Sequence, residues 1–361
     1  MDISKLDKNF NVDNNIPEDD VVWYNLAEAP FKLYGGQYTK DGYCRMSPEV
    51  AKMVSEGVKN LNYHTAGIRA RFKTNSPYIA ISVNWPRCGR MNHMALSGSS
   101  GFDLFRVKNK IHSFMCSFIP GAADPTEGFS GIKYLNIPKL EDKYSKDEVN
   151  DYILNFPLYN CVKDVFIGIK KGSVIEEGDE YSHSLPIVFY GSSITQGGCA
   201  SRPGNCYQNF LSREFDFNYI NLGFSGNGKG EDAIVDYMAN LEMSAFISDY
   251  DHNAPTKEHL EKTHYNMYKK IREKNPDIPY VIIGKPDFFN GEWERRAVIF
   301  ETFAKAKASG DKNVYYVDSS ALFGGINWDD CTVDGCHPTD LGFYKMYEAL
   351  LPTFKIIMGK K

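Results

Sequence analysis

The sequence predicts an α/β fold in which a five-stranded parallel sheet, covered by helices on both faces, follows an antiparallel, jelly-roll-like β-sandwich. Through about residue 172, short alternating or β-branched runs are broken by Gly, Pro, Asn and Asp, which is typical of antiparallel strands. Beyond that point strands alternate with helical segments, as in parallel sheets. The length of 361 residues also favours two domains. We expect them at residues 1–175 and 184–361.

The expected strands of the N-terminal half are short and end at turn-forming residues. They span residues 68–72, 78–83, 102–107, 111–118 and 162–169. One helix is expected over 48–60, where four apolar residues recur at helical spacing. The polar, glycine-containing stretch 170–183 is predicted to be a linker.

The C-terminal half has five apolar runs that are short enough to be buried strands. They span residues 186–190, 219–222, 245–248, 280–283 and 314–317. Helices are expected at 205–215, 231–242, 256–274, 292–308 and 339–351. Ligands of parallel sheets bind at the carboxyl ends of the strands. The residues that follow each strand are therefore the candidates for function.

Composition excludes several classes of protein. A net charge of −5 without a long basic block gives little attraction to nucleic acid or an anionic membrane, and we expect neither partner. No apolar run approaches the ~18–20 residues of a membrane span. The first 20 residues are polar and lack the apolar core of a signal peptide. The expected location is cytoplasmic for the sequence as given, and secreted or periplasmic if a signal peptide has been removed.

The eight cysteines are scattered and form no CxxC pair, so a structural zinc site is not expected. Their low density favours reduced thiols, but a disulfide between Cys199 and Cys206 stays open. The chemistry outlined below requires no metal and no organic cofactor, and we expect neither.

A serine follows the first strand of the predicted parallel sheet. The sequence Gly191-Ser192-Ser193 begins where the strand ends and places Ser193 at the carboxyl edge, a suitable position for a nucleophile. An isolated serine at such a place usually caps a helix or turns the chain. The functional interpretation therefore depends on a base elsewhere in the sequence.

Asp334 and His337 supply this base. Their spacing lets the Asp334 carboxylate fold back onto Nδ1 of His337, which fixes the tautomer and leaves Nε2 to accept a proton. Pro338 follows, near the first turn of the last helix. Together with the serine, these residues predict a Ser193–His337–Asp334 catalytic triad.

Two further strand ends carry possible oxyanion donors. Gly226 follows the second strand and can offer a backbone N–H without steric obstruction. Asn253 follows the third strand, and its amide is a neutral donor. A different interpretation is open for the glycine-rich segment: Gly223, Gly228 and Lys229 fit most of a phosphate-binding loop, with Gly in place of the final Ser or Thr. That alternative predicts a nucleotide binder.

These blocks resemble those of the SGNH (GDSL-type) hydrolase superfamily. Ser193 in GSSIT, Gly226 in NLGFSGN, Asn253 in DHNA and the pair Asp334 and His337 in DGCH occur in the order of that superfamily. The resemblance covers roughly residues 185–353. It implies a three-layer α/β/α domain in which Ser193, Gly226 and Asn253 form the oxyanion hole. The first and third blocks depart from the usual GDS and GxND.

The N-terminal half is similar to a second motif. Residues 101–105 (GFDLF) resemble the GxDLY motif of a β-sandwich domain that precedes some bacterial SGNH hydrolases. Members with such a sandwich are similar to carbohydrate O-acetyl esterases. The resemblance therefore implies a serine esterase that forms an acetyl-enzyme and acts on acetylated oligosaccharides or polysaccharides.

Aromatic residues near the strand ends are candidates for sugar contacts, because sugar faces pack on aromatic rings. Trp293 and Trp328 follow the fourth and fifth strands, and His252 precedes the asparagine of the third block. His93 and Trp85 of the sandwich could reach over the cleft, although a structural role is more usual for such residues.

Other functions stay open at this point. A short-chain lipid esterase, a thioesterase and an acyltransferase share the same machinery, but the long apolar lid expected of a lipid enzyme is not apparent. A carbohydrate-binding protein with a degenerate hydrolase domain would be expected to lack Ser193 or His337, and both are present.

Overall fold

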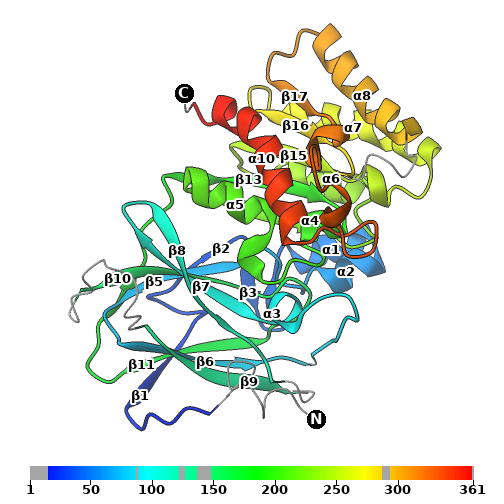
Figure 1. The fold of residues 1–361 in the computed structure, drawn as a ribbon. Coiled ribbons are helices and arrows are strands. Elements are labelled where there is room, and N and C mark those ends of the chain that lie inside the picture. The colour runs from blue at the N-terminus through cyan, green and yellow to red at the C-terminus, as the bar shows by residue number, and fades with distance from the viewer. Residues whose placement is uncertain (1–14, 87, 122–126, 136–147, 287–292, 360–361) are drawn as a thin grey trace.

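The computed structural model describes residues 15–86, 88–121, 127–135, 148–286 and 293–359. Its C-terminal half is a five-stranded parallel sheet in the order β14-β13-β15-β16-β17 (Figure 1). The strands are β13 (His183–Gly191), β14 (Phe217–Gly223), β15 (Ala245–Asp249), β16 (Tyr280–Ile283) and β17 (Val314–Val317). The predicted fold class is confirmed.

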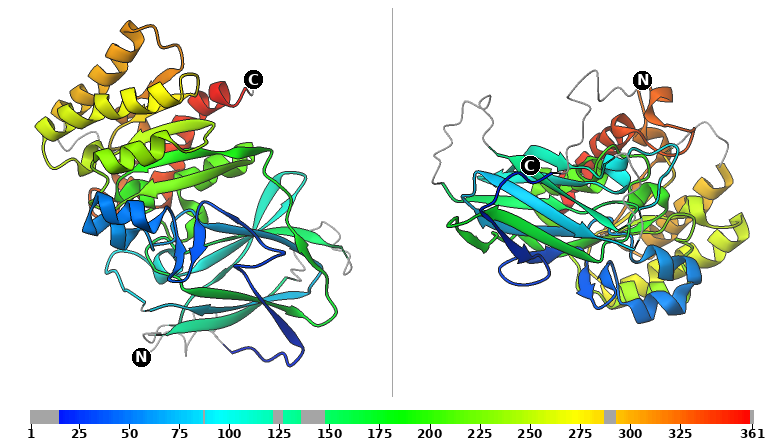
Figure 2. Two further views of the ribbon diagram at one scale, coloured as in Figure 1. Left: turned by 180° about the vertical axis from the view of Figure 1, so that it is seen from behind. Right: turned by 90° about the horizontal axis from the view of Figure 1, so that it is seen from below.

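Helices cover both faces of this sheet (Figure 2). They are α5 (Tyr207–Phe215), α6 (Asp232–Ala239), α7 (Lys257–Lys274), α8 (Trp293–Ala308) and α10 (Asp340–Ile357). Ile187 and Phe189 of β13 share one core with α5 and α10, whereas Val188 and Tyr190 share the other with α6, α7 and α8. All four side chains are buried because successive residues of a strand point to opposite faces.

The strand order creates a switch point at the end of β13. This strand lies between β14 and β15, and the chain visits β14 before it crosses to β15. Gly191, the last residue of β13, is aligned with Gly223 and Asp249, the last residues of its neighbours. The segments that follow these three strands therefore leave the sheet side by side, at the edge where ligands bind in such folds.

The N-terminal half consists of two packed antiparallel sheets. One contains β1 (Val21–Asn25), β11 (Asp164–Lys170), β6 (Tyr78–Asn84) and β9 (Gly128–Tyr134). The other contains β12 (Ile175–Glu177), β5 (Arg69–Thr74), β10 (Asn150–Asn155), β7 (Phe102–Lys108) and β8 (Ile111–Phe118), with β2 (Lys32–Tyr34) paired to β5. Ile81 and Ile167 from the first sheet and Phe72 and Leu154 from the second meet in one core. A small hairpin of β3 (Gln37–Thr39) and β4 (Gly42–Cys44) adjoins it.

The outer face of the second sheet is joined to the C-terminal half by a buried carboxylate. Asp103, the aspartate of the GFDLF motif, is completely buried. Its oxygens accept hydrogen bonds from Asn155 Nδ2 at 2.7 Å, Gly204 N at 2.8 Å and Arg202 Nη1 at 3.0 Å. Gly204 and Arg202 follow the first strand of the parallel sheet, so the motif ties the sandwich to the segment that carries Ser193.

The predicted helix over 48–60 is wrong in detail. The segment forms two helices, α1 (Pro48–Val54) and α2 (Glu56–Leu61). The break occurs because Ser55 is extended, with φ −170°, and its Oγ accepts the N–H of Val58 as the cap of α2. Both helices pack against the C-terminal half beside α6, although they come from the N-terminal half (Figure 1).

Two other element predictions need correction. The predicted linker 170–183 contains β12, which pairs with β5. The last helix continues beyond residue 351 through Pro352 to Ile357, because Leu350 and Phe354 are both fully buried on one face and this burial outweighs the hydrogen bond that proline removes. Residue 292, the predicted start of α8, lies outside the described residues. None of the described helices has the length and apolar character needed to cross a membrane.

Candidate active site

Ser193 lies at the switch point of the parallel sheet. It is the first residue of the short helix α4 (Ser193–Gln196), which begins directly after β13. Ser192 caps this helix: its Oγ accepts the N–H of Ile194 at 3.1 Å. The two serines thus have separate tasks, and Ser193 keeps its hydroxyl for contacts outside the helix.

His337 and Asp334 approach Ser193 from the other end of the chain. His337 Nε2 lies 2.9 Å from Ser193 Oγ, and His337 Nδ1 lies 2.7 Å from Asp334 Oδ2. Both residues belong to the loop 332–338, here called the histidine loop, which closes where Val333 N–H donates to the carbonyl of His337. The three predicted triad residues therefore form a chain of two hydrogen-bond contacts, from the hydroxyl to the imidazole and from the imidazole to the carboxylate.

Asp334 is held as a carboxylate. Partial burial acts to raise the pKa of this carboxyl, but hydrogen bonds from the backbone and ring of His337 and from the Cys336 backbone outweigh it and lower the pKa to about 2. A carboxylate at Nδ1 favours the tautomer in which Nε2 carries the lone pair. Nε2 is then able to accept the Ser193 proton.

Close packing behind the serine sets its distance to the imidazole. Gly198 is the residue that permits this approach, because a Cβ there would lie 3.0 Å from His337 Cδ2 and 3.1 Å from the Ser193 carbonyl oxygen. Tyr159, from the sandwich, donates its hydroxyl to the same carbonyl at 3.1 Å. The sequence did not single out Tyr159, since nothing in its local pattern links it to the end of β13, 32 residues later.

Gly226 has the one unoccupied backbone donor of its loop. The N–H groups of the other residues donate as follows: Phe224 to the Gly191 carbonyl, Ser225 to Gln196 Oε1, Asn227 and Gly228 to the Phe224 carbonyl, Lys229 to Glu231 Oε2 and Gly230 to the Tyr190 hydroxyl. Among the described residues, none offers an acceptor to the N–H of Gly226. Gly226 is exposed, and its φ of +67° favours glycine at this position. This donor is free to bind a ligand oxygen.

The same hydrogen bonds argue against a phosphate-binding loop. Such a loop needs several N–H groups that converge on one anion, whereas those around Lys229 are already used within the protein. The carboxylate of Glu231 also accepts the N–H of Lys229 and would repel a phosphate. The nucleotide alternative therefore does not fit the structure.

Asn253 is anchored to the same loop. Its Nδ2 donates one hydrogen to the Phe224 carbonyl at 2.8 Å, which leaves the second hydrogen of the amide. Phe224 in turn donates its N–H to the Gly191 carbonyl at 2.9 Å. The ends of three neighbouring strands are thereby joined around Phe224. The predicted donors Ser193, Gly226 and Asn253 all follow these strand ends.

Gln196 is a buried residue that the sequence analysis missed. Its Oε1 accepts the N–H of Ser225 at 3.0 Å, and its Nε2 lies 3.1 Å from the Leu158 carbonyl oxygen and 3.3 Å from His64 Nδ1. It thus holds the residue before Gly226 and connects the site to the N-terminal half. The one sequence feature that could have indicated Gln196 is its position three residues after Ser193, in the same short helix.

The predicted substrate contacts lie in different surroundings. His252 Nε2 is 3.2 Å from Cys336 Sγ, which places its ring beside the histidine loop. Trp293 begins α8 and is 58% exposed, with the Arg296 guanidinium 4.9 Å from its ring centroid. Trp328 is 40% exposed and precedes the histidine loop by four residues.

Of the two sandwich residues considered for the cleft, one reaches the triad. The ring of His93 lies 5.6 Å from the ring of His337, centroid to centroid. Trp85 is buried in the sandwich core instead. Cys199 and Cys206, whose pairing was open, are both buried free thiols in the structure.

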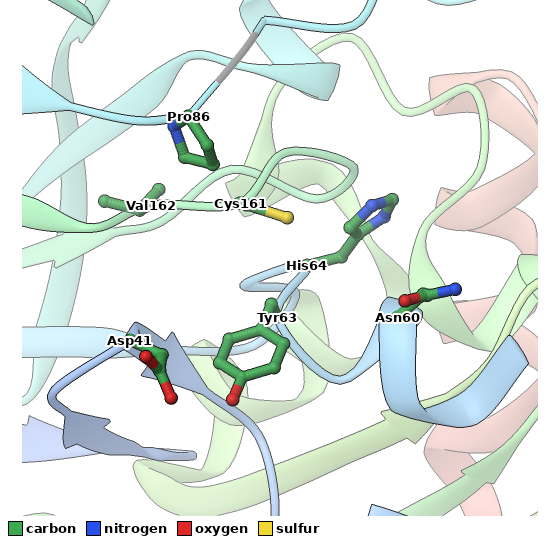
Figure 3. A pocket seen from close by; sticks show the side chains of 7 residues that line it. All are labelled: Asp41, Asn60, Tyr63, His64, Pro86, Cys161 and Val162. Carbon is green, nitrogen blue, oxygen red and sulfur yellow. The ribbon is translucent and has the colours of Figure 1, made fainter. Parts of the chain in front are cut away.

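A cavity of about 510 Å³ lies in the N-terminal half (Figure 3). Its lining is Asp41, Asn60, Tyr63, His64, Pro86, Cys161 and Val162. His64 connects it to the site through Gln196, three residues from Ser193. The cavity thus combines a carboxylate, an amide, an imidazole and an aromatic ring, and its volume is typical of small-molecule sites.

Both halves of the chain match known family models. Residues 184–355 match the GDSL-like lipase/acylhydrolase family, and residues 21–175 match the GxDLY model, described as the N-terminus of an SGNH hydrolase-type esterase. Among curated proteins, none matches the chain significantly.

Solved structures are similar over nearly the whole chain. A protein described as a GDSL-like lipase from Bacteroides ovatus ATCC 8483 is 29% identical, with a TM-score of 0.80 over 94% of this chain and 99% of that chain. The salicylyl-acyltransferase SsfX3 of a tetracycline biosynthetic pathway is 15% identical, with a TM-score of 0.71 over 92% and 96% of the two chains. The acetyl xylan esterase Est2A from the rumen bacterium Butyrivibrio proteoclasticus is 12% identical, with a TM-score of 0.59 over 94% and 99%. For the last two, the similarity concerns the fold.

Proposed function

Because the chain belongs to the GDSL-like lipase/acylhydrolase family of SGNH hydrolases and has a GxDLY-type N-terminal region, we propose that it is a serine esterase that removes O-acetyl groups from carbohydrates. The observation that carries the esterase assignment is the continuous relay from Ser193 Oγ through His337 to Asp334, with distances of 2.9 and 2.7 Å. This arrangement activates a hydroxyl as a nucleophile.

In the proposed reaction, Ser193 Oγ attacks the carbonyl carbon of the ester while His337 Nε2 takes its proton. Asp334 stabilises the imidazolium that forms. When the tetrahedral intermediate collapses, His337 returns the proton to the departing sugar hydroxyl and an acetyl-enzyme remains. A water molecule, deprotonated by His337, then releases acetate and restores Ser193.

The negative charge of the intermediate requires donors that are already in place. We assign this role to the backbone N–H groups of Ser193 and Gly226 and to the amide of Asn253. Two of these donors are held by the loop around Phe224, so that little reorganisation is needed when the oxyanion forms. This preorganisation is the usual source of the largest rate contribution in acyl transfer.

The cavity that His64 and Gln196 connect to the site supports a carbohydrate as the alcohol part of the ester. Sugar hydroxyls pair well with carboxylate and amide groups such as those of Asp41 and Asn60, and a sugar face can pack on the Tyr63 ring. These side chains belong to the N-terminal half, which would give the sandwich a role in selecting the substrate.

Acetate release from acetylated xylo-, manno- and cello-oligosaccharides tests this proposal, with p-nitrophenyl acetate, p-nitrophenyl octanoate and an acetyl thioester for comparison. We expect an acetylated oligosaccharide to have the highest kcat/KM. The variants Asp41→Asn and Tyr63→Ala should raise KM for that oligosaccharide. They should leave KM for p-nitrophenyl acetate unchanged, because this ester is too small to fill the cavity. A preference for octanoate or the thioester would contradict the carbohydrate assignment.

Asn253→Ala is expected to lower kcat by about 10²–10³ and to change KM little, because the amide would act mainly on the transition state. Asn227→Ala is the matched control. Its amide also donates to a backbone carbonyl of this loop, that of Ser225 at 2.8 Å, but is not assigned to the oxyanion. An equal loss of kcat in both variants would show that loop structure, and not oxyanion binding, is what Asn253 provides.

A further inference from the structure

Three side chains beside the nucleophile form a cluster of metal-ligand type. His93, Cys199 and His337 each place a nitrogen or sulfur atom within 4.8 Å of those of the other two. They come from three distant parts of the chain: the loop after β6, the segment after α4 and the histidine loop. Imidazole nitrogen and thiolate sulfur are the preferred ligands of Zn²⁺.

The separations exceed those that a bound ion requires by at most about 1.5 Å. Zn–N distances of about 2.0–2.1 Å and a Zn–S distance of about 2.3 Å place the ligand atoms of a tetrahedral site about 3.3–3.6 Å apart. Cys199 is buried, so its side chain has little room to move. His93 is exposed, so its ring can move by the ångström or so that remains.

His337 already has the second-sphere partner that zinc-binding histidines usually have. Its Nδ1 bonds to Asp334 Oδ2 at 2.7 Å, which leaves Nε2 as the metal ligand. In many zinc sites a carboxylate accepts a hydrogen bond from the histidine that binds the metal. This contact increases the basicity of the ligand nitrogen. The contact that prepares His337 as a base thus also prepares it as a ligand.

From these contacts we infer that His93, Cys199 and His337 Nε2 bind one zinc ion, and that this ion reversibly inhibits the enzyme. The inhibition rests on the proposed function, whereas the binding does not. Zinc would occupy the nitrogen lone pair that accepts the Ser193 proton, so the nucleophile would lose its base. Three protein ligands leave a fourth position for water or for the Ser193 hydroxyl.

Binding exchanges the thiol proton for the metal. The thiolate is the form of Cys199 that binds zinc, so the thiol releases one proton when the Zn–S bond forms. This competition and the missing fourth protein ligand weaken the site relative to structural zinc sites. We therefore expect half-inhibition at free zinc concentrations on the order of 1–10 μM.

The test compares ester hydrolysis with increasing Zn²⁺ for the wild type and single variants, each relative to its own metal-free rate. Wild-type activity should fall as Zn²⁺ is added and should return when EDTA removes the metal. Mg²⁺ should leave the activity unchanged, because it prefers oxygen ligands. His93→Ala and Cys199→Ser should each raise the half-inhibiting concentration at least about 100-fold, since even second-sphere changes cost about 10–100-fold in metal affinity.

Two matched controls keep the test specific. His183→Ala removes an exposed histidine at the opposite end of β13, and Cys336→Ser removes a thiol of the histidine loop that is outside the cluster. Both should retain inhibition by Zn²⁺. Unchanged inhibition in His93→Ala and Cys199→Ser, or its loss in Cys336→Ser, would place the ion elsewhere and overturn the inference.

Binding is measured separately with Co²⁺ on the full chain. The wild type and Ser193→Ala should bind one Co²⁺ with the absorption of a sulfur-to-cobalt charge transfer, and Cys199→Ser should lack this band. Absence of the band in the wild type would overturn the zinc site. If the band appears and no ester is hydrolysed, the proposed function fails and the metal site stands.

Discussion

Ser193→Ala is expected to reduce the hydrolysis of p-nitrophenyl acetate and of acetylated oligosaccharides by about 10⁴–10⁶-fold in kcat, because the variant has no hydroxyl to form the acetyl-enzyme. The fold should be unaffected. The Oγ atom is bonded to His337 Nε2, and the helix cap belongs to Ser192 instead. Steady-state rates and the melting temperature of both proteins check this prediction.

Ser320→Ala is the matched control for this change. Ser320 also follows a strand of the parallel sheet, after β17, but its Oγ bonds to Asp318. Its replacement should leave the rate within a factor of about two. If Ser193→Ala retained wild-type turnover while the protein stayed folded, the proposed nucleophile would be wrong.

Asp334→Asn is expected to lower kcat by about 10⁴-fold. The carboxylate accepts the proton of His337 Nδ1, whereas an amide can instead donate to this nitrogen and favour the tautomer with the proton on Nε2. Ser193 would then face a donor and lose its base. The pKa of Asp334, lowered to about 2, indicates that the wild-type side chain is ionised at neutral pH.

The sign of this pKa change also bears on stability. The pKa of Asp334 is lower in the folded protein than the ordinary 3.8, so its stabilising contribution is complete above about pH 5 and is lost progressively between about pH 5 and pH 1. Loss of stability above about pH 5 therefore does not come from Asp334.

Asp330→Asn controls for the loss of charge. Asp330 is exposed and lies four residues before Asp334, so the substitution removes the same charge near the same loop but no contact with the imidazole. We expect little change in kcat. A comparable loss in both variants would mean that Asp334 acts through the general electrostatic field, in contradiction to the relay.

The periodicity of the sequence was sufficient for the parallel sheet. All five strands were expected where they occur, because strands buried on both faces are continuous apolar runs bounded by turns. The sandwich was less visible. β10 (Asn150–Asn155) was missed because its polar side chains suggest exposure, yet all six residues are buried at the contact between the two sheets and the C-terminal half. Burial of this kind depends on a partner surface that local sequence does not contain.

The candidate site likewise contains residues that a local sequence pattern identifies and residues that only distant contacts identify. Ser193, Asp334 and His337 could be named from local spacing, because a strand end and a short Asp-to-His interval each have their own sequence pattern. Tyr159 could not, since its hydrogen bond to the Ser193 carbonyl crosses a long interval of sequence. Gln196 lies three residues after Ser193, but its hydrogen bond to the Ser225 N–H also crosses a long interval. The glycine-rich loop stayed ambiguous until its occupied N–H groups were known.

By itself, the sequence determined the order of elements in the C-terminal half, the parallel sheet and the identity of the residues that follow each strand, because these depend on contacts within a few residues. Only the tertiary structure decided which of those residues meet. His93, Cys199 and His337 are separated by more than 100 residues in sequence and are within 4.8 Å in space. A cluster assembled from separate loops has no local sequence pattern. The expectation that no metal is bound could therefore be questioned only from the tertiary structure.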